Sequence, residues 1–558
     1  MPEVIVGRDE DDTKKYGTTG TLFMGKHLVG TGEDTHMTTP VLLDVLRPHI
    51  ITISGKRGEG KCISSSTLIR LEDNSVVPIK ELEKINKRVL ALNKEGRIVP
   101  AKKSHFYKRN VNHMLKIKLS TGREIELTSE HPLLTQHGWK PAADLLIGSQ
   151  IVVTDVNVSK SNNQALLISS IFLDTIVSVE SLEGSFEVYD ISVPEYHNFI
   201  ANDIIVHNSF TMGVIMEEML KLPPHIRKNL CGIVVDTQGI YWTMKSPSEK
   251  DATLLNAWEM KPSGFNVDVY VPEGQEKTFR SAGVDFDETF SFAPSDISAE
   301  DWLGVFDLNP NEPLGILMQR SITKLSGNYS IDDIIKSIKS SEGFENEKLA
   351  LENRFEAAKS WGIFGSSRVP PLLEPGKMTI LDISLTPQNV RTLLVGLVSK
   401  KIFLERVEAR RKEELAEIEI ATIKRTPMPW IFIDEAHNFL PSDGITSATE
   451  PLNRIVKEGR QPGITLVLAT QRPEKLHPDA LAQTDMIISH RLTAKNDVDA
   501  LKAIMQTYLL YDIGKYINEL PKLKGVAIIL DDNSERLYKV RIRPRQSWHA
   551  GSSPVAIN

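Results

Sequence analysis

Residues 55–62 read "GKRGEGKC", and this short stretch organises the interpretation of the whole chain. Its first seven letters, from Gly55 to Lys61, satisfy the phosphate-binding loop pattern G-x-x-x-x-G-K-[ST]. The eighth position of that pattern is Ser or Thr, because its hydroxyl holds the Mg²⁺ of a bound nucleotide. Cys62 stands there instead. The apolar, β-branched run 49–54 before the loop predicts the buried strand that such a loop needs.

The chain after Cys62 does not continue as the helix that normally follows a phosphate-binding loop. Residues 62–208 consist of short alternating segments separated by Gly and Asn turns, which predicts an all-β region. The next stretch, "SFTMGVIMEEMLKL" (209–222), places its apolar side chains on one helical face. Removing 62–208 gives "HIITISGKRGEGKSFTMGVIMEEMLKL", a strand, a complete loop and a helix with no residue missing or extra. The predicted nucleotide-binding loop is therefore Gly55, Lys56, Arg57, Gly58, Glu59, Gly60, Lys61 and Ser209.

The two ends of this inserted segment carry groups suited to acyl transfer. The thiol of Cys62 lies next to the Lys61 carbonyl in sequence and can form a thioester with it. The Ser209 hydroxyl can take over that acyl group, and the Asn208 side-chain amide can attack its own backbone carbonyl and cleave the chain. An O-to-N shift then leaves an ordinary amide. The ends of the segment therefore predict its self-excision.

Three stretches of the insert, "CISSSTLI" (62–69), "GREIELTSEHPLL" (122–134) and "VYDISVPEYHNFIANDIIVHNS" (188–209), resemble the splicing blocks of an intein, a self-splicing protein insert. The resemblance implies a horseshoe-shaped, all-β Hint-type fold that needs no cofactor. No LAGLIDADG-type endonuclease motif is found in the sequence, so a mini-intein is expected. The resemblance also implies roles for five further residues. Thr128 and His131 polarise the Lys61–Cys62 amide, Asp190 coordinates thioester transfer, His197 assists Asn208 cyclisation, and His207 protonates the leaving amine.

The flanking sequence carries a second set of motifs. The strand-like "PMPWIFIDEAHNFLP" (427–441) ends in Asp434 and Glu435, a Walker B pattern in which Asp434 holds Mg²⁺ through water and Glu435 activates the attacking water. Four other apolar runs alternate with helical stretches, which predicts an α/β fold, a doubly wound parallel sheet with helices on both faces. One run ends in Gln471, where such sheets bind ligands and a side chain can sense the γ-phosphate.

These motifs, with "VVDTQGIYW" (234–242), "KEGRQPGITLVLATQRP" (457–473) and "RIRPRQSWH" (541–549), resemble the HerA branch of the HerA/FtsK family of DNA-translocating ATPases. The resemblance implies an α/β RecA-like P-loop ATPase core, a homo-hexameric ring, ATP and Mg²⁺ between subunits, and DNA in the pore. It also implies an arginine that reaches the neighbour's phosphate, a role that Arg460 matches best and Arg454 second. Asp236 matches the acid of the branch's D-P-x-G-E-Y motif, whereas Ile240 replaces its Glu. The short N-terminal region leaves a partnership with a NurA-type nuclease open.

Composition sets the broad class of the protein. The chain has 558 residues, 41% of them hydrophobic, a formal net charge of −7 and two cysteines, which predicts a protein of several domains without a disulfide framework. It contains no apolar signal core or spanning segment, so a cytoplasmic location and no membrane association are expected. The predicted parts are 1–61, an N-terminal segment and the first part of the ATPase core; 62–208, the splicing domain; 209–295, the core continued; 296–370, a helical insertion; and 371–558, the core with Walker B, sensor and C-terminal segment.

The sequence is compatible with three functions. In the first, the chain is a precursor that excises 62–208, joins Lys61 to Ser209 and yields a DNA translocase or helicase. In the second, the ATPase acts on protein or signalling partners instead of DNA. In the third, the intact chain is stable and the insert is a non-splicing regulatory domain. Stimulation of ATP hydrolysis by DNA separates the first two, and the mass of the expressed protein tests the third.

Overall fold

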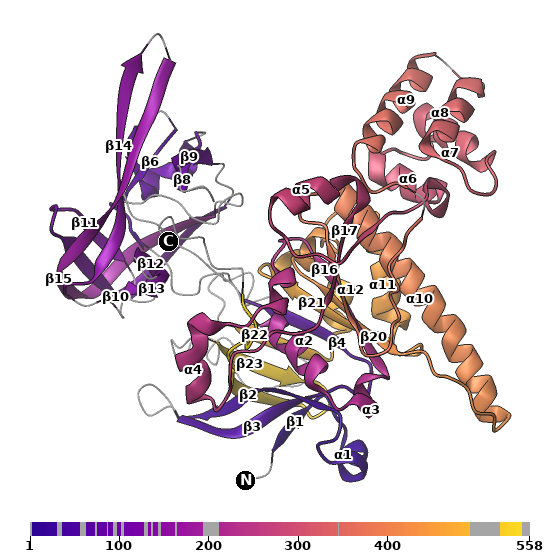
Figure 1. The fold of residues 1–558 in the computed structure, drawn as a ribbon, viewed down its shortest axis with the longest axis horizontal. Coiled ribbons are helices and arrows are strands. Elements are labelled where there is room, and N and C mark those ends of the chain that lie inside the picture. Colours follow the sequence, from indigo (N-terminus) through magenta and orange to yellow (C-terminus); the bar gives the residue numbers. More distant parts are fainter. Residues whose placement is uncertain are drawn as a thin grey trace. The chain divides into compact units, whose positions relative to one another are not determined.

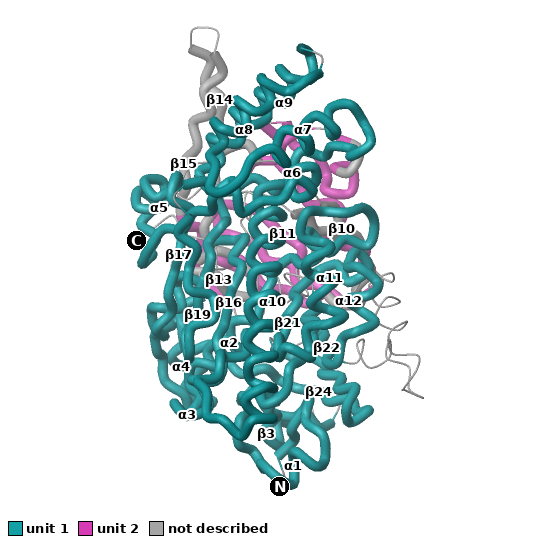
Figure 2. Tube along the Cα trace, turned by 90° about the vertical axis from the view of Figure 1, so that its right-hand side faces the viewer, with its two compact units in different colours: residues 1–56, 210–549 teal, residues 57–209, 550–558 magenta. Residues whose placement is uncertain are grey.

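The structure, a computed structural model, forms two compact units, each built from two stretches of chain (Figure 2). The α/β unit comprises residues 1–56 and 210–549, and the β unit comprises residues 57–209 and 550–558. The residues that the structure describes are 3–30, 36–55, 63–72, 75–85, 87–92, 98–101, 105–127, 132–135, 138–142, 145, 147–161, 164–192, 211–343, 345–365, 367–490, 520 and 525–549.

The α/β unit is built on one large mixed sheet (Figure 1). Across the sheet the described strands are β1 (Val4–Val6), β3 (His36–Asp44), β2 (Thr21–Val29), β24 (Arg536–Ile542), β23 (Val526–Asp531), β22 (Met486–His490), β4 (Ile50–Ser54), β21 (Thr465–Thr470), β20 (Met428–Ile433), β16 (Leu230–Asp236), β19 (Met378–Asp382), β17 (Asp268–Pro272) and β18 (Glu288–Phe290). The strands from β22 to β18 all run parallel, whereas β23, β24 and β2 continue the sheet in antiparallel pairings. The predicted parallel α/β core is confirmed, and the N-terminal strands extend it.

Helices cover both faces of this sheet. Side chains alternate along each strand, so one strand contributes apolar residues to the helical layers on both faces. In β20, Trp430 and Phe432 pack into the same apolar cluster as Val214 of α2 (Met212–Lys221). Ile431 and Ile433 point to the other face, into the cluster that contains α10 (Gln388–Ile418) and α11 (Thr449–Glu458). Shorter helices complete the layers: α1 (Glu10–Tyr16), α3 (Pro224–Arg227), α4 (Ala252–Ala257), α5 (Glu276–Ser281) and α12 (Pro478–Ala482).

Four helices between β18 and β19 gather into a group of their own (Figure 1). They are α6 (Ala299–Phe306), α7 (Pro313–Thr323), α8 (Ile331–Ser340) and α9 (Glu345–Lys359). Capping boxes start α6 and α8, with Ser298 and Ser330 each accepting a hydrogen bond from the third helical N–H. The buried Trp302 packs its ring 4.9 Å from that of Phe355, which joins α6 to α9.

The β unit has only antiparallel pairings among its described strands. Its main sheet has the order β10 (His105–Leu119), β11 (Glu124–Leu127), β5 (Ile63–Ser64), β15 (Gln164–Ser192), β14 (Gln150–Ser161), β12 (Pro132–Thr135) and β13 (Gly138–Pro141). Two small ribbons pair β6 (Leu68–Arg70) with β7 (Val76–Pro78) and β8 (Val89–Leu92) with β9 (Ile98–Ala101). Buried aliphatic side chains such as Ile117 and Ile151 form its core. The predicted all-β architecture of the insert is confirmed.

In the described part of the chain, no helix combines the length and the apolar character that crossing a membrane requires.

Candidate active site

Three adjacent parallel strands of the α/β unit bring the candidate nucleotide-binding residues to one edge of the sheet. β4 pairs with β21 and β21 pairs with β20, so their carboxyl ends lie together. Gly55 follows β4, Gln471 follows β21, and Asp434 and Glu435 follow β20. This edge is where open parallel sheets bind ligands. The remaining loop positions, Lys56, Arg57, Gly58, Glu59, Gly60, Lys61 and Ser209, lie outside the described residues.

Glu435 has the geometry of a preorganised base. Its backbone is in the left-handed region at φ 51°, which is uncommon for a residue with a side chain and often marks a functional site. The residue is 9% exposed, and its Oε1 accepts a hydrogen bond from Nε2 of Gln471. Its Oε2 lies 3.6 Å from Nδ1 of His437. A buried carboxylate held in this way can orient and deprotonate a water molecule.

Two neighbours tie Glu435 to the surrounding strands. Oδ1 of Asp434 accepts a hydrogen bond of 2.8 Å from the Glu435 backbone N–H, which holds the turn between the two acids. His437 Nδ1 lies 3.0 Å from the hydroxyl of Thr470, the last residue of β21. Carboxylate oxygens such as those of Asp434 are the ligands that Mg²⁺ prefers, so the chemistry of this strand end suits the ion. The sequence motif contained His437, but nothing in the local pattern assigned it a role.

His490, at the end of β22, is a further residue of this edge that sequence reasoning missed. Its Nδ1 lies 2.9 Å from the Val526 carbonyl oxygen, which only accepts, so Nδ1 carries the proton. Nε2 then accepts a hydrogen bond of 2.5 Å from the hydroxyl of Thr211. Burial lowers the pKa of His490 despite the Val526 carbonyl, which raises it, and this favours the neutral ring. A Cβ atom added to Gly55 would come within 2.7 Å of the His490 Cβ.

Asp236 belongs to a buried acidic pair next to these strands. It lies opposite Asp382 in the parallel pairing of β16 with β19. Its Oδ1 accepts hydrogen bonds from the N–H groups two and three residues ahead, at 3.0 and 2.8 Å, and its Oδ2 accepts from those of Ile240 and Tyr241, both at 2.8 Å. Burial and then the charge of Asp382 raise the pKa of Asp236 to about 7, although these N–H groups lower it. Ile240 thus contributes its backbone where the family motif has a Glu.

Arg460 lies at the amino ends of the parallel strands, opposite the carboxyl ends where Glu435 lies. It follows α11 and precedes β21, and its guanidinium forms an ion pair with Asp485 just before β22. The Oδ2 of Asp485 accepts a hydrogen bond of 2.8 Å from the N–H of Ile50, the first residue of β4. Within one chain the structure therefore does not bring Arg460 together with Glu435. The Arg460 side chain remains 56% exposed.

Arg454, the second candidate, contacts its own helix α11 and the neighbouring helix α10. Its Nε lies 3.2 Å from Oε2 of Glu458, and its guanidinium carbon lies 4.4 Å from the centre of the Phe403 ring. Both partners are within the same chain, so nothing in this arrangement points to a nucleotide.

The C-terminal segment of the α/β unit is buried against α2. Arg543 and Arg545 lie 2.8 and 3.3 Å from the two carboxylate oxygens of Glu217, and the Ser547 hydroxyl donates to Glu217 at 2.6 Å. Arg543, Arg545 and Glu217 are at most 1% exposed. Burial raises the pKa of Glu217, but the charges of Arg545 and Arg543 outweigh it and the net shift is downward. Helix α2 is thus held in place by a buried carboxylate whose charge two buried arginines balance.

Most predicted splicing residues lie outside the described residues: Cys62, Thr128, His131, His197, His207, Asn208 and Ser209. For Asp190 the structure describes the backbone, which lies in β15 opposite Tyr107 of β10. Among the described residues, no group of three or more His, Cys, Asp or Glu side chains is placed to hold a metal ion.

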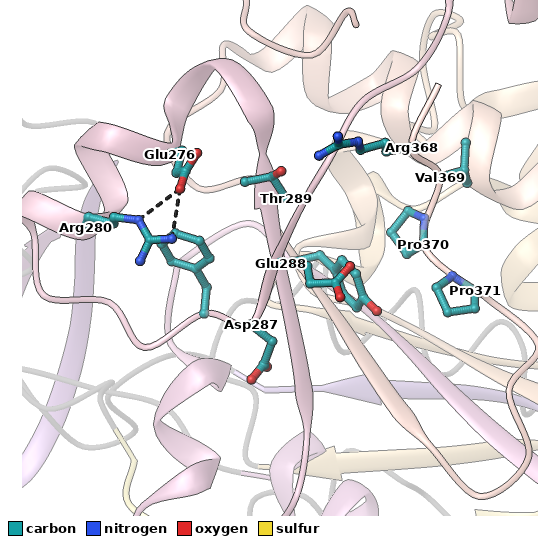
Figure 3. Close-up of a pocket in the computed structure, with 11 residues that line it drawn as sticks. Glu276, Arg280, Asp287, Glu288, Thr289, Arg368, Val369, Pro370 and Pro371 are labelled. Carbon is teal, nitrogen blue, oxygen red and sulfur yellow. Dashed lines mark hydrogen bonds and ion pairs between the residues drawn. The ribbon is translucent and has the colours of Figure 1, made fainter. Parts of the chain in front are cut away.

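A polar hollow of about 610 Å³ lies elsewhere, beside β17 and β18 at the far end of the strand order (Figure 3). Glu276 and Arg280 form an ion pair of 2.8 Å in its wall, while Arg368 and the Pro370–Pro371 pair line another part. Its position separates it from the ends of β4, β20 and β21, so it is not part of the candidate active site.

Comparison with known proteins assigns both parts of the chain. Residues 69–208 match the family described as "Intein splicing domain", and residues 209–402 match "Helicase HerA, central domain". The DNA double-strand break repair helicase HerA of Pyrococcus furiosus is 28% identical over 162 residues, which are 26% of this chain and 29% of that protein. The probable DNA double-strand break repair helicase HerA of Methanocaldococcus jannaschii is 31% identical over 140 residues, 22% of this chain and 28% of that protein.

Among solved structures, a DnaB intein from Synechocystis sp. PCC 6803 is 31% identical, with 27% of this chain and 99% of that chain covered and a TM-score of 0.22. The chain spans less than a third of the length of the two HerA relatives. The two family matches meet between residues 208 and 209. The chain therefore combines two families: an intein splicing domain of the mini-intein type, and the HerA-like P-loop ATPase core that it interrupts.

Proposed function

We propose that the chain is a precursor that excises residues 62–208 and joins Lys61 to Ser209. The observation that carries the proposal is the restored loop: with the insert removed, Ser209 completes the pattern that begins at Gly55. The fold supports it, because β4 before the insert and α2 after it belong to the same compact unit.

The chemistry proceeds in four acyl-transfer steps. The Cys62 thiolate attacks the Lys61 carbonyl, so a thioester forms as the peptide bond breaks and the Cys62 amine is released. The Ser209 hydroxyl attacks that thioester, which forms an ester and restores the thiol. The Asn208 side-chain nitrogen attacks its own carbonyl, which breaks the bond to Ser209 and releases the insert with a terminal succinimide. The freed Ser209 amine finally attacks the ester and leaves an amide.

Assistance in these steps is proposed for five residues of the insert. Thr128 and His131 activate the first peptide bond, Asp190 directs the transfer to Ser209, His197 assists Asn208, and His207 protonates the amine that leaves.

The joined product is proposed to hydrolyse ATP. Bound Mg²⁺ would neutralise charge on the phosphates, and the Ser209 hydroxyl and Asp434 are the residues that would hold it. Glu435 orients and deprotonates the attacking water, and Gln471 holds the Glu435 carboxylate while reporting on the γ-phosphate. Support comes from the meeting of these residues at the carboxyl ends of β4, β21 and β20.

The product is further proposed to act on DNA as a homo-hexameric ring, because the HerA relatives carry the name of DNA repair helicases. In such a ring Arg460 would act on the nucleotide of a neighbouring subunit. The Arg460 side chain is exposed at the amino ends of the parallel strands, away from the Glu435 of its own chain. An action on a neighbouring subunit would fit this position.

The splicing proposal is tested by expressing the full chain beside a Cys62→Ala, Asn208→Ala double variant. Intact mass should show the wild-type chain as a ligated product plus a free insert, and the double variant as one species of the full 62.4 kDa. Recovery of the wild-type chain at that same full mass would favour the non-splicing regulatory insert.

The purified product is then assayed for ATP hydrolysis with and without duplex and single-stranded DNA. Stimulation by DNA supports the translocase. Hydrolysis that no DNA affects would favour an ATPase that acts on protein or signalling partners.

A further inference from the structure

One histidine of the α/β unit contacts both segments that flank the insert. Gly55, seven positions before Cys62 in the sequence, packs so closely on His490 that an added Cβ would lie 2.7 Å from the His490 Cβ. Thr211, two positions after Ser209, donates its hydroxyl to Nε2 of the same ring at 2.5 Å. The insert therefore leaves and re-enters the α/β unit at neighbouring points.

The segment after the insert is also anchored independently. Glu218 of α2 accepts a hydrogen bond of 3.2 Å from the backbone N–H of Phe23 in β2, and Arg543 lies 2.8 Å from its other oxygen. Glu217 of the same helix is held by Arg543, Arg545 and Ser547. Because these partners are far away in sequence, α2 is fixed by the folded unit and not by its connection to β4.

His490 is itself held in place from a third element. Its Nδ1–H donates to the Val526 carbonyl of β23, and it is the last residue of β22, which pairs with β4. The ring therefore cannot rotate to follow a displaced Thr211 without giving up its bond to Val526. This makes it a rigid point against which the two flanks are positioned.

We infer that the ATPase fold acts as a template for splicing, with His490 as the positioning residue that holds the two splice junctions close together. The inference rests on the proposed splicing function. It adds that a residue of the ATPase core, outside the insert, controls the outcome of splicing. An extended chain spans at most about 3.6 Å per residue, so the Lys61 carbonyl stays within about 22 Å of Gly55 and Ser209 within about 7 Å of Thr211.

The step that depends on this tether is the transfer of the acyl chain from Cys62 to Ser209. Holding two reacting groups at short separation raises their effective concentration, and a lost constraint lowers it. When transfer is slow, hydrolysis of the thioester and cyclisation of Asn208 cut the chain at the two junctions without joining it. Weakening the contacts of His490 therefore shifts the outcome from ligation to cleavage.

The test uses the full chain and measures ligated product, released insert and unjoined fragments over time by intact mass. Thr211→Val keeps the side-chain shape but removes the donor to His490, and it is expected to lower the ratio of ligation to cleavage by about three- to tenfold, as the loss of one hydrogen bond allows. Thr211→Ser keeps the hydroxyl and restores the ratio. Gly55→Ala displaces His490 from the other flank and shifts the ratio in the same direction.

Thr386→Val is the matched control. Thr386 and Thr211 are both buried, 3% and 8% exposed, and the Thr386 hydroxyl donates to the Ile383 carbonyl at 2.7 Å, just after β19 and away from both flanks of the insert. It should splice like the wild type. A wild-type ratio in Thr211→Val and Gly55→Ala, or an equal loss in Thr386→Val, would overturn the inference. Failure of the wild-type chain to release any insert would instead overturn the proposed function, and the inference with it.

Discussion

The side-chain amide of Gln471 donates a hydrogen bond to Oε1 of Glu435, across the ends of the adjacent strands β21 and β20. The residue proposed to sense the γ-phosphate is thereby in direct contact with the residue proposed to activate water. A movement of Gln471 on binding or release of phosphate would reach the Glu435 carboxylate without any intermediate side chain. This contact couples the two side chains, so a change in one is expected to affect the other.

Glu435→Gln in the joined product is expected to lower the rate of ATP hydrolysis by about 10²- to 10⁴-fold, the contribution of a positioned base. Affinity for ATP should remain close to that of the wild type, because the substitution keeps the shape of the side chain and removes only its basicity. Steady-state hydrolysis and a fluorescent-nucleotide titration measure the two quantities. Glu276→Gln, on the surface helix α5, is the control that should change neither.

Gln471→Ala is expected to lower hydrolysis about tenfold, and its effect should not add to that of Glu435→Gln. Non-additivity follows because Gln471 acts through the carboxylate that the other variant removes. A double-mutant cycle on the hydrolysis rate measures it. Strictly multiplicative losses would show that Gln471 works independently of Glu435.

Arg460→Ala and Glu435→Gln should each inactivate the joined product, and mixed subunits should recover activity. In a randomly mixed ring, about a quarter of the interfaces would pair an intact Glu435 with an intact Arg460 from the neighbour. Hydrolysis is measured after unfolding and refolding the two variants together. Arg454→Ala alone should stay active. If it is instead inactive alone and recovers on mixing with Glu435→Gln, the role moves to Arg454, and an inactive Arg460→Ala mixture would exclude action of Arg460 across a subunit interface.

The stability of the joined product should depend on the charge of the Asp236–Asp382 pair. The pKa of Asp236 is raised from 3.8 to about 7 by burial and by Asp382, so the folded state favours the protonated form. The stability from this group is complete below pH 3.8 and is lost as the pH rises through 7. Asp382→Asn removes the neighbouring charge and keeps an oxygen for Ser384, so the loss between pH 5 and 8 should become smaller.

Urea unfolding of wild type and Asp382→Asn at several pH values within that window measures the difference. Asp333→Asn is the control, because hydrogen bonds from Ser330 lower the pKa of Asp333 to about 2. The stability that Asp333 contributes is lost only as the pH falls through about 2. The effect of Asp333→Asn on stability should therefore be constant from pH 5 to 8. An unchanged pH dependence in Asp382→Asn would contradict the raised pKa of Asp236.

The unspliced chain is expected to bind ATP at least about tenfold more weakly than the joined product, since the loop lacks the hydroxyl and N–H groups that converge on phosphates. In the Cys62→Ala, Asn208→Ala double variant, β4 and α2 keep their places in the α/β unit. The loss would therefore belong to the interrupted loop and not to a missing helix. Isothermal titration of both proteins with ATP and Mg²⁺ compares their affinities, and equal affinities would refute the expectation.

The family of each part and the class of each fold could be predicted from sequence, because they depend on neighbours along the chain. The loop pattern from Gly55 to Lys61, the Ser209 that completes it and the alternating segments between them are all local signals. The apolar runs that became β16, β19, β20 and β21 were likewise recognisable as strands of a parallel sheet.

The strand order had no such local signal, and it decides which residues meet. β4 lies between β21 and β22 although more than 400 residues separate it from either, so His490 comes to rest against Gly55. The same order places Arg460 at the amino ends of the parallel strands, away from Glu435, and sets Asp236 opposite Asp382. Sequence patterns report the periodicity of a single element, whereas these contacts depend on how distant elements share the burial of one core, and only the tertiary structure specifies that arrangement.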